Sequence, residues 1–362
     1  MDAVQFISAP ASAAAPSRIV ARLGGIDSIR AICAGTVVLG HLGLFSDATV
    51  HGHGWLTLAG RITPLLFNAP AAVIVFFIIS GFVIHLPFHG GRAPDIPSFL
   101  TRRLVRVVLP SLIAFVLATY ALRNNGGILD VIWSIYCEII YYVLYPVLRR
   151  IALRVGWGRM VIVTYVVSVI LPLAQLHLLV EANNSYTALG NAQTWIIGLP
   201  CWLMGCWLAE NSDRFKPLSL GRLWQFRIGI YVLAEVLRTV KFHVHSPFAS
   251  NVFMLNLFAF PACAWLGYEI AHFRTVKASK LLEWMGGWSY SLYLVHPMSV
   301  PLLAVLHFAL LNTLIDHFHP FLPLLAAVFS YIYFLVIENP SHKLAKALSR
   351  AVARKPAPAE KG

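Results

Sequence analysis

Ten long runs of apolar residues constrain this chain more than any other feature of its sequence. A helix needs about 20 mainly apolar residues to cross the hydrocarbon layer of a bilayer, and each run meets or approaches that length. Transmembrane strands would instead give short segments of alternating polarity, which we do not find. We therefore expect an all-α, polytopic transmembrane helical bundle with about ten membrane-spanning helices, near residues 26–46, 64–88, 102–121, 128–150, 158–180, 192–210, 224–241, 250–273, 286–310 and 318–337.

The composition and the distribution of charge agree with a membrane protein. The chain is 58% hydrophobic and 12% charged, whereas soluble proteins average roughly 25% charged residues. Most lysines and arginines fall in alternate loops between the runs, and such positive loops face the cytoplasm. Both termini are therefore expected in the cytoplasm. The same asymmetry accounts for the net charge of +13 without a nucleic-acid partner, because the basic residues form no dense patch interleaved with aromatic residues.

Three parts of the chain can be distinguished by composition. Residues 1–23 are rich in Ala, Ser and Pro and lack the apolar core of a signal peptide, so we expect a disordered cytoplasmic arm. Residues 24–340 hold all the apolar runs and form the transmembrane domain. Residues 341–362 form a short basic cytoplasmic tail that begins as an interfacial helix. No pattern in the sequence indicates an oligomeric state.

The cysteines and the paired histidines do not indicate a metal site. All five cysteines fall inside predicted spans without metal-ligand spacing, and we interpret them as small buried residues. His-x-His pairs occur in predicted outer loops, but two histidines make an incomplete metal site. We therefore expect no metal. The pairs are at positions 51/53, 243/245 and 317/319.

Two ionisable side chains lie inside the first apolar run. A charge at the centre of a bilayer costs at least ~2.5 kcal/mol, so such residues usually have a partner or a function. Arg30 and His41 are about three helical turns apart, which places them on one helix face and roughly 16 Å apart along its axis. Arg30 is expected near the cytoplasmic surface and His41 beyond the midplane. This face presents a positive anchor at the inner surface and a titratable base deep in the membrane.

Two further stretches place charged residues in or beside the spans. In "FLTRRLVRVVLP", Arg103 and Arg106 share a helix face and could either anchor the helix to lipid headgroups or hold phosphate groups. In "VIWSIYCEIIYYVLYP", Glu138 lies in the middle of an apolar span, with Ser134 four residues before it. Glu138 could satisfy a polar group of a neighbouring helix or take part in chemistry. Spacing alone does not decide either case.

A third stretch, "WMGGWSYSLYLVHPMSV", places Ser289, Tyr293 and His296 along one stripe of a helix, directly before Pro297. Such a stripe could line a polar cavity. It could also join neighbouring helices by hydrogen bonds within the membrane.

Taken in order, these stretches resemble the acyltransferase-3 family of bacterial membrane acyltransferases. The opening "IDSIRA" begins an Arg-x10-His pattern, from Arg30 to His41. It is followed by "FFIISGFVI", by "RRLVRVVLP", and by a Trp-Ser-x3-Glu pattern that ends at Glu138. "SYSLYLVHP" and a closing "ENP" complete the set. The resemblance covers about residues 24–340, which would then form the acyltransferase domain. Ile139 stands where the family often has a second carboxylate after the glutamate.

The resemblance implies an integral O-acyltransferase of the bacterial cytoplasmic (inner) membrane. Members of the family move an acyl group, commonly acetyl, from cytoplasmic acyl-coenzyme A to a hydroxyl group. We therefore expect acetyl-coenzyme A, or another acyl-coenzyme A, as the co-substrate. The expected acceptor is a carbohydrate or a lipid-linked saccharide destined for the cell surface or secretion, and membrane lipids surround the protein.

The resemblance also implies roles for the polar residues within the spans. His41 would act as general base on the acceptor hydroxyl or as a transient acyl carrier. Glu138 would be the second catalytic residue and would orient the His41 imidazole, as a carboxylate does in a catalytic triad. Arg30, Arg103 and Arg106 would bind the phosphates of coenzyme A. The cavity would be lined by Ser80, Ser134, Tyr293 and His296.

Two other classes of protein remain open from the residues alone. A proton- or anion-coupled transporter could use the buried His, Glu and Arg set as a relay or substrate site. Paired inverted repeats with broken helices would favour a transporter, and we find none. A membrane scaffold or flippase-like partner would need no chemistry. Only the enzyme should release free thiol from labelled acetyl-coenzyme A in the presence of an acceptor.

Overall fold

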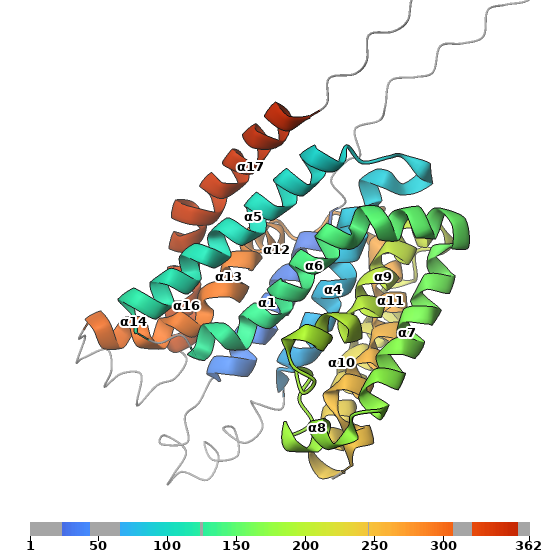
Figure 1. The fold of residues 1–362 in the computed structure, drawn as a ribbon, viewed down its shortest axis with the longest axis horizontal. Coiled ribbons are helices and arrows are strands. Elements are labelled where there is room, and N and C mark those ends of the chain that lie inside the picture. Colours follow the sequence, from blue (N-terminus) through green and yellow to red (C-terminus); the bar gives the residue numbers. More distant parts are fainter. Residues whose placement is uncertain (1–23, 44–65, 124–125, 245, 307–320, 354–362) are drawn as a thin grey trace, which may run out of the picture.

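The computed structural model describes residues 24–43, 66–123, 126–244, 246–306 and 321–353, and these residues form helices without strands (Figure 1). The expected all-α fold is confirmed, and the described part of each predicted apolar run falls on one helix or on consecutive helices. Within the described residues, six helices are long and apolar enough to cross a membrane. The count of about ten spans and the location of the termini stay predictions.

Except for the last one, the main helices follow the predicted runs closely. Short helices and 3₁₀ turns connect them. The longer ones are α1 (Ile26–Leu42), α4 (Ala69–His85), α5 (Ile96–Val116), α6 (Gly126–Val155), α7 (Trp157–Leu173), α9 (Asn191–Asn211), α10 (Leu220–His243), α11 (Asn251–Phe273), α16 (Phe321–Tyr333) and α17 (Asn339–Val352). The shorter ones are α8 (Leu176–Glu181), α12 (Lys280–Gly286), α13 (Ser289–Val295) and α14 (Ser299–Leu306).

The outer surface of the bundle is strongly apolar. Ile162, Val163 and Ile170 on α7 and Leu112 on α5 each expose more than half of their surface. A large exposed apolar surface is unfavourable in water. Against lipid tails the same side chains are favourable, because both surfaces are apolar. The outer surface therefore fits a chain embedded in a bilayer.

Helices α4 and α9 form the most closely packed pair in the centre of the bundle. α4 is apolar around its whole circumference, and most of its residues are buried. A Cβ atom at Gly81 would collide with the carbonyl oxygen of Trp202, and one at Gly205 would collide with that of Ile78. The two backbones can approach so closely because these positions are glycine.

The start of α1 is fixed by a residue far along the chain. The Glu283 carboxylate, from α12, accepts hydrogen bonds from the backbone N–H groups of Gly25 (3.0 Å) and Ser28 (2.9 Å) and from the Ser28 hydroxyl (2.7 Å). A carboxylate is favourable here because the first N–H groups of a helix have no internal partners and carry partial positive charge. Gly286 packs directly against the backbone of Asp27. These contacts fix where α1 begins.

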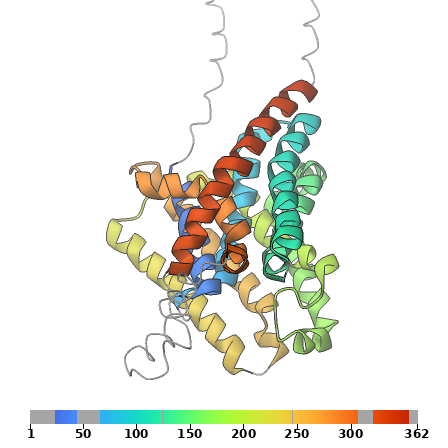
Figure 2. The ribbon, with the colours of Figure 1, turned by 90° about the vertical axis from the view of Figure 1, so that its left-hand side faces the viewer.

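Helices α16 and α17 form one continuous rod through the π-turn η7 (Phe334–Glu338). The α17 part lies beside α5, as two views show (Figures 1 and 2). Ser341, Ala345 and Ser349 are buried at intervals of four residues, so small side chains form the packed stripe of α17. The boundary that we expected at residue 340 lies inside this rod, and the first part of the predicted tail is a helix packed on the bundle.

Candidate active site

A cavity of about 150 Å³ lies among α1, α4, α5, α6 and α13. Its walls are mainly apolar, with Phe76 and Phe77 from α4 among them. Most of the polar residues that the sequence singled out also line it, although they come from helices far apart in the chain. These are Arg30, Ser80, Arg103, Arg106, Ser134, Glu138 and Tyr293.

The three arginines of the cavity keep most of their hydrogen-bonding capacity. Arg30 donates from one terminal nitrogen to Asp27 (3.2 Å), and Arg106 donates from Nε to His342 (2.9 Å). Arg103 has no hydrogen bond or ion pair with any residue that the structure describes. Cations in a mainly apolar cavity are costly unless an anion joins them. The arginines therefore make this cavity suited to a phosphate-bearing ligand.

Arg149 and Arg150, at the end of α6, differ in environment. Arg149 is buried and donates to the backbone carbonyls of Gly91 (2.7 Å) and Arg92 (2.5 Å), so it holds the segment before α5. Arg150 is exposed. Arg150 is the suitable control in tests of the cavity arginines.

Glu138 lies in the cavity and is held by neighbouring hydroxyl groups. Its Oε1 accepts hydrogen bonds from the Ser80 hydroxyl (2.6 Å) and from the Tyr142 hydroxyl. The indole N–H of Trp202 in turn donates to the Ser80 oxygen (3.2 Å). Both hydrogen bonds of this carboxylate in the described part of the chain therefore go to α4 and α6. His41, which the sequence suggested as its partner, is not among them.

Ser134 and Tyr293 join α6 to α13 at the cavity wall. The Ser134 hydroxyl donates to the Val131 carbonyl (3.0 Å) and lies 2.6 Å from the Tyr293 hydroxyl, which can donate to it. The ring of Phe76 packs edge-on against the ring of Tyr293, with centroids 5.8 Å apart. Both residues line the cavity, and their hydrogen bond also fixes the position of α13.

The partner of His41 is His296. Nδ1 of His41 lies 2.9 Å from Nε2 of His296, and the ring centroids are 5.1 Å apart. His296 is fully buried at the end of α13, where the helix turns into η6 (His296–Met298), whereas His41 is exposed. Neither ring lines the cavity of about 150 Å³. They lie close to it, since Tyr293 lines the cavity and its ring centroid is 6.5 Å from that of His296.

The hydrogen bonds of His296 determine which nitrogen of His41 carries a proton. Nδ1 of His296 lies 2.9 Å from the Tyr293 carbonyl oxygen, to which only an N–H can donate. A neutral histidine has one N–H, so Nε2 of His296 is the acceptor and receives the Nδ1–H of His41. The Nε2 of His41 is then an unprotonated nitrogen without a hydrogen-bond partner among the described residues. This is the protonation state that a general base or a nucleophile requires.

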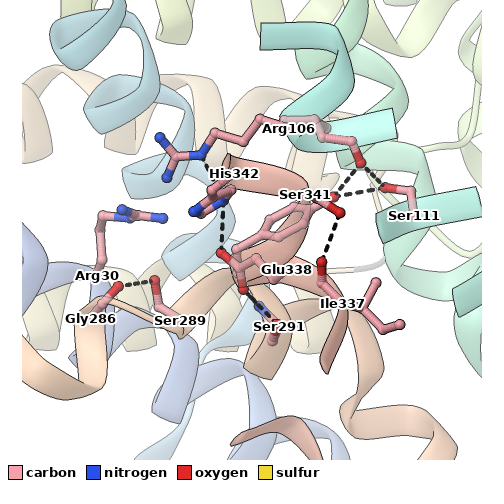
Figure 3. Close-up of polar contacts among 12 residues, drawn as sticks. Arg30, Arg106, Ser111, Gly286, Ser289, Ser291, Ile337, Glu338, Ser341 and His342 are labelled. Atoms are coloured by element: carbon pink, nitrogen blue, oxygen red, sulfur yellow. Dashed lines mark hydrogen bonds and ion pairs between the residues drawn. The ribbon is translucent and has the colours of Figure 1, made fainter. Parts of the chain in front are cut away.

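A network that sequence reasoning did not identify extends from Arg106 (Figure 3). His342 Nε2, which accepts from Arg106, lies 3.3 Å from Oε1 of the buried Glu338. The other oxygen of Glu338 accepts from the backbone N–H (3.1 Å) and the hydroxyl (2.5 Å) of Ser291 on α13. The "ENP" motif could have indicated Glu338. Nothing in the sequence distinguishes His342 from other residues of the basic tail.

The histidine pairs considered as metal ligands fall wholly or partly outside the described residues, because positions 51, 53, 245, 317 and 319 lie there. Among the residues that are described, no group of three or more potential ligands is close enough to hold a metal ion.

Comparison with known proteins identifies the family. Residues 23–338 match the sequence model of the acyltransferase-3 family, which is described as an acyltransferase domain. No curated protein and no solved structure matches the chain. The family match covers most of the 362 residues and agrees with the order of the motifs. The chain therefore belongs to the acyltransferase-3 family and is an acyltransferase.

Proposed function

We propose that this protein is an O-acetyltransferase of the bacterial inner membrane. It would move an acetyl group from cytoplasmic acetyl-coenzyme A to a hydroxyl of a glycan or glycolipid destined for the cell surface or secretion. The observation that carries the proposal is the hydrogen-bonded pair of His296 and His41, because it leaves one unprotonated nitrogen next to a cavity that contains three arginines.

The arginine side of the cavity suits the donor. Coenzyme A carries several phosphate groups, and a guanidinium can bind a phosphate through two parallel hydrogen bonds. Arg103 has no partner in the described part of the chain, and Arg106 uses only Nε. With Arg30, they offer donors from α1 and α5. About three helical turns separate Arg30 from His41, so the thioester would reach His41 through the extended arm of the donor.

His41 is proposed to act as general base. Its Nε2 takes the proton of the acceptor hydroxyl while the hydroxyl oxygen bonds to the thioester carbonyl carbon. The carbon–sulfur bond then breaks, and the imidazolium returns the proton to the thiolate, which leaves free coenzyme A and an ester. His296 keeps Nδ1–H of His41 hydrogen-bonded throughout. It thereby fixes the tautomer, which is the orienting task of the third residue of a catalytic triad.

The same lone pair also permits the acyl-carrier route. In that case His41 Nε2 attacks the thioester itself, and an acetyl-imidazole forms before the acceptor reacts. Rapid quenching of the enzyme with labelled donor, followed by peptide mass spectrometry, separates the routes. An acetyl group on the peptide that contains His41 would establish the carrier route.

Glu138 is proposed as the second functional carboxylate of the cavity. It lines the same space as Arg103, and Ser80 and Tyr142 hold its Oε1. In the absence of donor, its negative charge would offset the arginines. Ser80, Ser134 and Tyr293 are proposed to line the path of the donor.

The test uses purified protein in lipid nanodiscs, labelled acetyl-coenzyme A, and a glycolipid and glycan extract of the host as acceptor. The expected result is label in the extract together with an equal amount of free thiol. His41→Ala should abolish both, while His177→Ala, which changes an exposed histidine of α8, should not. Transfer by His41→Ala at the wild-type rate would refute the assignment of the base. Absence of transfer from acetyl-coenzyme A by the wild type would refute the proposed donor.

A further inference from the structure

Three helices meet in a polar network beside the cavity (Figure 3). Arg106 belongs to α5, His342 to α17, and Ser291 to α13, and Glu338 at the end of η7 joins the last two. Glu338 is almost fully buried, and His342 is partly buried. A buried carboxylate costs free energy unless it is paired and hydrogen-bonded, so this network calls for an explanation.

The contact with His342 restricts how Arg106 can present its guanidinium. The N–H of Nε is the donor closest to the main chain, and it points to His342 Nε2 at 2.9 Å. With this donor engaged, the plane of the guanidinium cannot rotate freely. The two terminal amino groups have no partner among the described residues, and Arg106 lines the cavity. They form the end of the fork that binds a phosphate through two hydrogen bonds.

Glu338 lies beside His342 and accepts hydrogen bonds from α13. His342 Nε2 accepts from Arg106 and so has no proton for Oε1 of Glu338, 3.3 Å away. A neutral His342 therefore makes no hydrogen bond to Glu338, and the side chain of Arg30 extends toward this group of residues (Figure 3). Oε2 of Glu338 accepts the backbone N–H of Ser291, in the first turn of α13, where a negative charge is favourable. His296, the partner of His41, directly follows the last residue of α13.

We propose that His342 is a positioning residue for the acyl donor. His342 holds Nε of Arg106 so that the terminal amino groups face the cavity and bind a phosphate group of coenzyme A. The inference rests on the proposed function, since it assumes a coenzyme A thioester as donor.

The decisive experiment is a double-mutant cycle between Arg106 and His342, with purified protein in nanodiscs and coenzyme A as the ligand in titration calorimetry. His342→Leu removes the acceptor and keeps a side chain of similar bulk. It should weaken coenzyme A binding by about two- to tenfold, which is the range for one hydrogen bond. In the Arg106→Ala background the same change should have no further effect. His342→Gln should bind almost as the wild type does, because its amide oxygen can accept from Nε.

Two controls separate positioning from general loss of structure. The thermal midpoint of each variant is measured, and His177→Leu replaces an exposed histidine in α8. His177→Leu should leave coenzyme A binding unchanged. Glu338→Gln keeps an acceptor for Ser291 but removes the charge, and it should weaken coenzyme A binding less than His342→Leu does. In transfer assays, His342→Leu should raise the donor KM with little change in kcat.

The possible outcomes are distinct. If His342→Leu weakens binding equally in both backgrounds, His342 acts independently of Arg106 and the inference is wrong. If it has no effect in the wild-type background while Arg106→Ala weakens binding, the Nε contact is irrelevant and the inference is wrong. If the wild type binds no coenzyme A, the proposed donor fails, and the inference fails with it.

Discussion

Replacement of His296 by phenylalanine tests the central feature of the site. The phenyl group would keep a planar ring in a fully buried position, but it would lose both ring nitrogens. His41 would then lose the acceptor of its Nδ1–H, and the Tyr293 carbonyl would lose the donor that lies 2.9 Å from it. The proton of His41 could then reside on either nitrogen. In the tautomer with the proton on Nε2, His41 cannot accept a proton from the acceptor hydroxyl.

The general energetics of the lost hydrogen bond and of the tautomer set limits for the size of this effect. The lower limit is the loss of one hydrogen bond to His41, which is about 0.5–1.5 kcal/mol, or roughly two- to tenfold in rate. The upper limit is the loss seen when a triad histidine takes the wrong tautomer, which is about 10⁴-fold. We expect a fall in kcat between these limits, with the donor KM unchanged, because His296 does not line the cavity with the arginines.

The assay is transfer of labelled acetyl groups to the host glycolipid extract, expressed per folded molecule after the thermal midpoint of each variant has been measured. His296→Gln places an amide oxygen near the position of Nε2, so it should recover much of the activity that the phenylalanine variant loses. Turnover by His296→Phe within twofold of the wild type would refute the reasoning. So would a large loss that His296→Gln fails to recover at equal stability.

Four other results are expected. His41→Ala should abolish transfer, measured in membranes, while the protein still inserts. Glu138→Gln should lower turnover by about two to four orders of magnitude if the carboxylate acts at the reacting centre; a lower thermal midpoint with nearly normal turnover would make it structural. Arg103→Ala should raise the donor KM about ten- to a hundredfold, the value of a charge-assisted contact, whereas Arg150→Ala should not. Gly81→Val should destabilise the protein by about 1–3 kcal/mol in thermal unfolding, because its side chain meets the α9 backbone.

The positions of the helices could be predicted because bilayer thickness dictates their length. The apolar runs located α4, α5 and α11 to within several residues. Polar residues of the cavity could also be identified from the sequence. Arg30 and Arg103 are costly in an apolar span, so such residues usually have a partner or a function. Each of these arguments depends on one segment at a time.

The partner of His41 could not be predicted in this way. Glu138 was the natural candidate, because it is a carboxylate in the middle of an apolar span, but its hydrogen bonds go to Ser80 and Tyr142. The contact with His296 depends on the relative height of α1 and α13. That height is set by side-chain packing between segments that are distant in the sequence. The pattern of residues within either segment does not predict this packing. The role of His342 was missed for the same reason.

The cap on α1 has a consequence for how the protein is made. Ser28 and Glu283 are 255 positions apart, and so are His41 and His296. At roughly 5–20 residues per second of synthesis, α1 waits about 10 to 50 s before its cap and its histidine partner exist. During that interval the nascent α1 has to keep Arg30 and His41 in the membrane without them.

Arg30 can reach the headgroups in the meantime, because a long side chain near a helix end can extend to the interface. His41 has no such length. The pair of histidines is therefore completed only after α12 and α13 have been synthesised, and a nascent chain that stops before His296 contains the base but cannot orient it. Ribosomes stalled at successive positions should accordingly show α1 becoming protected from labelling only after α12 and α13 have been inserted.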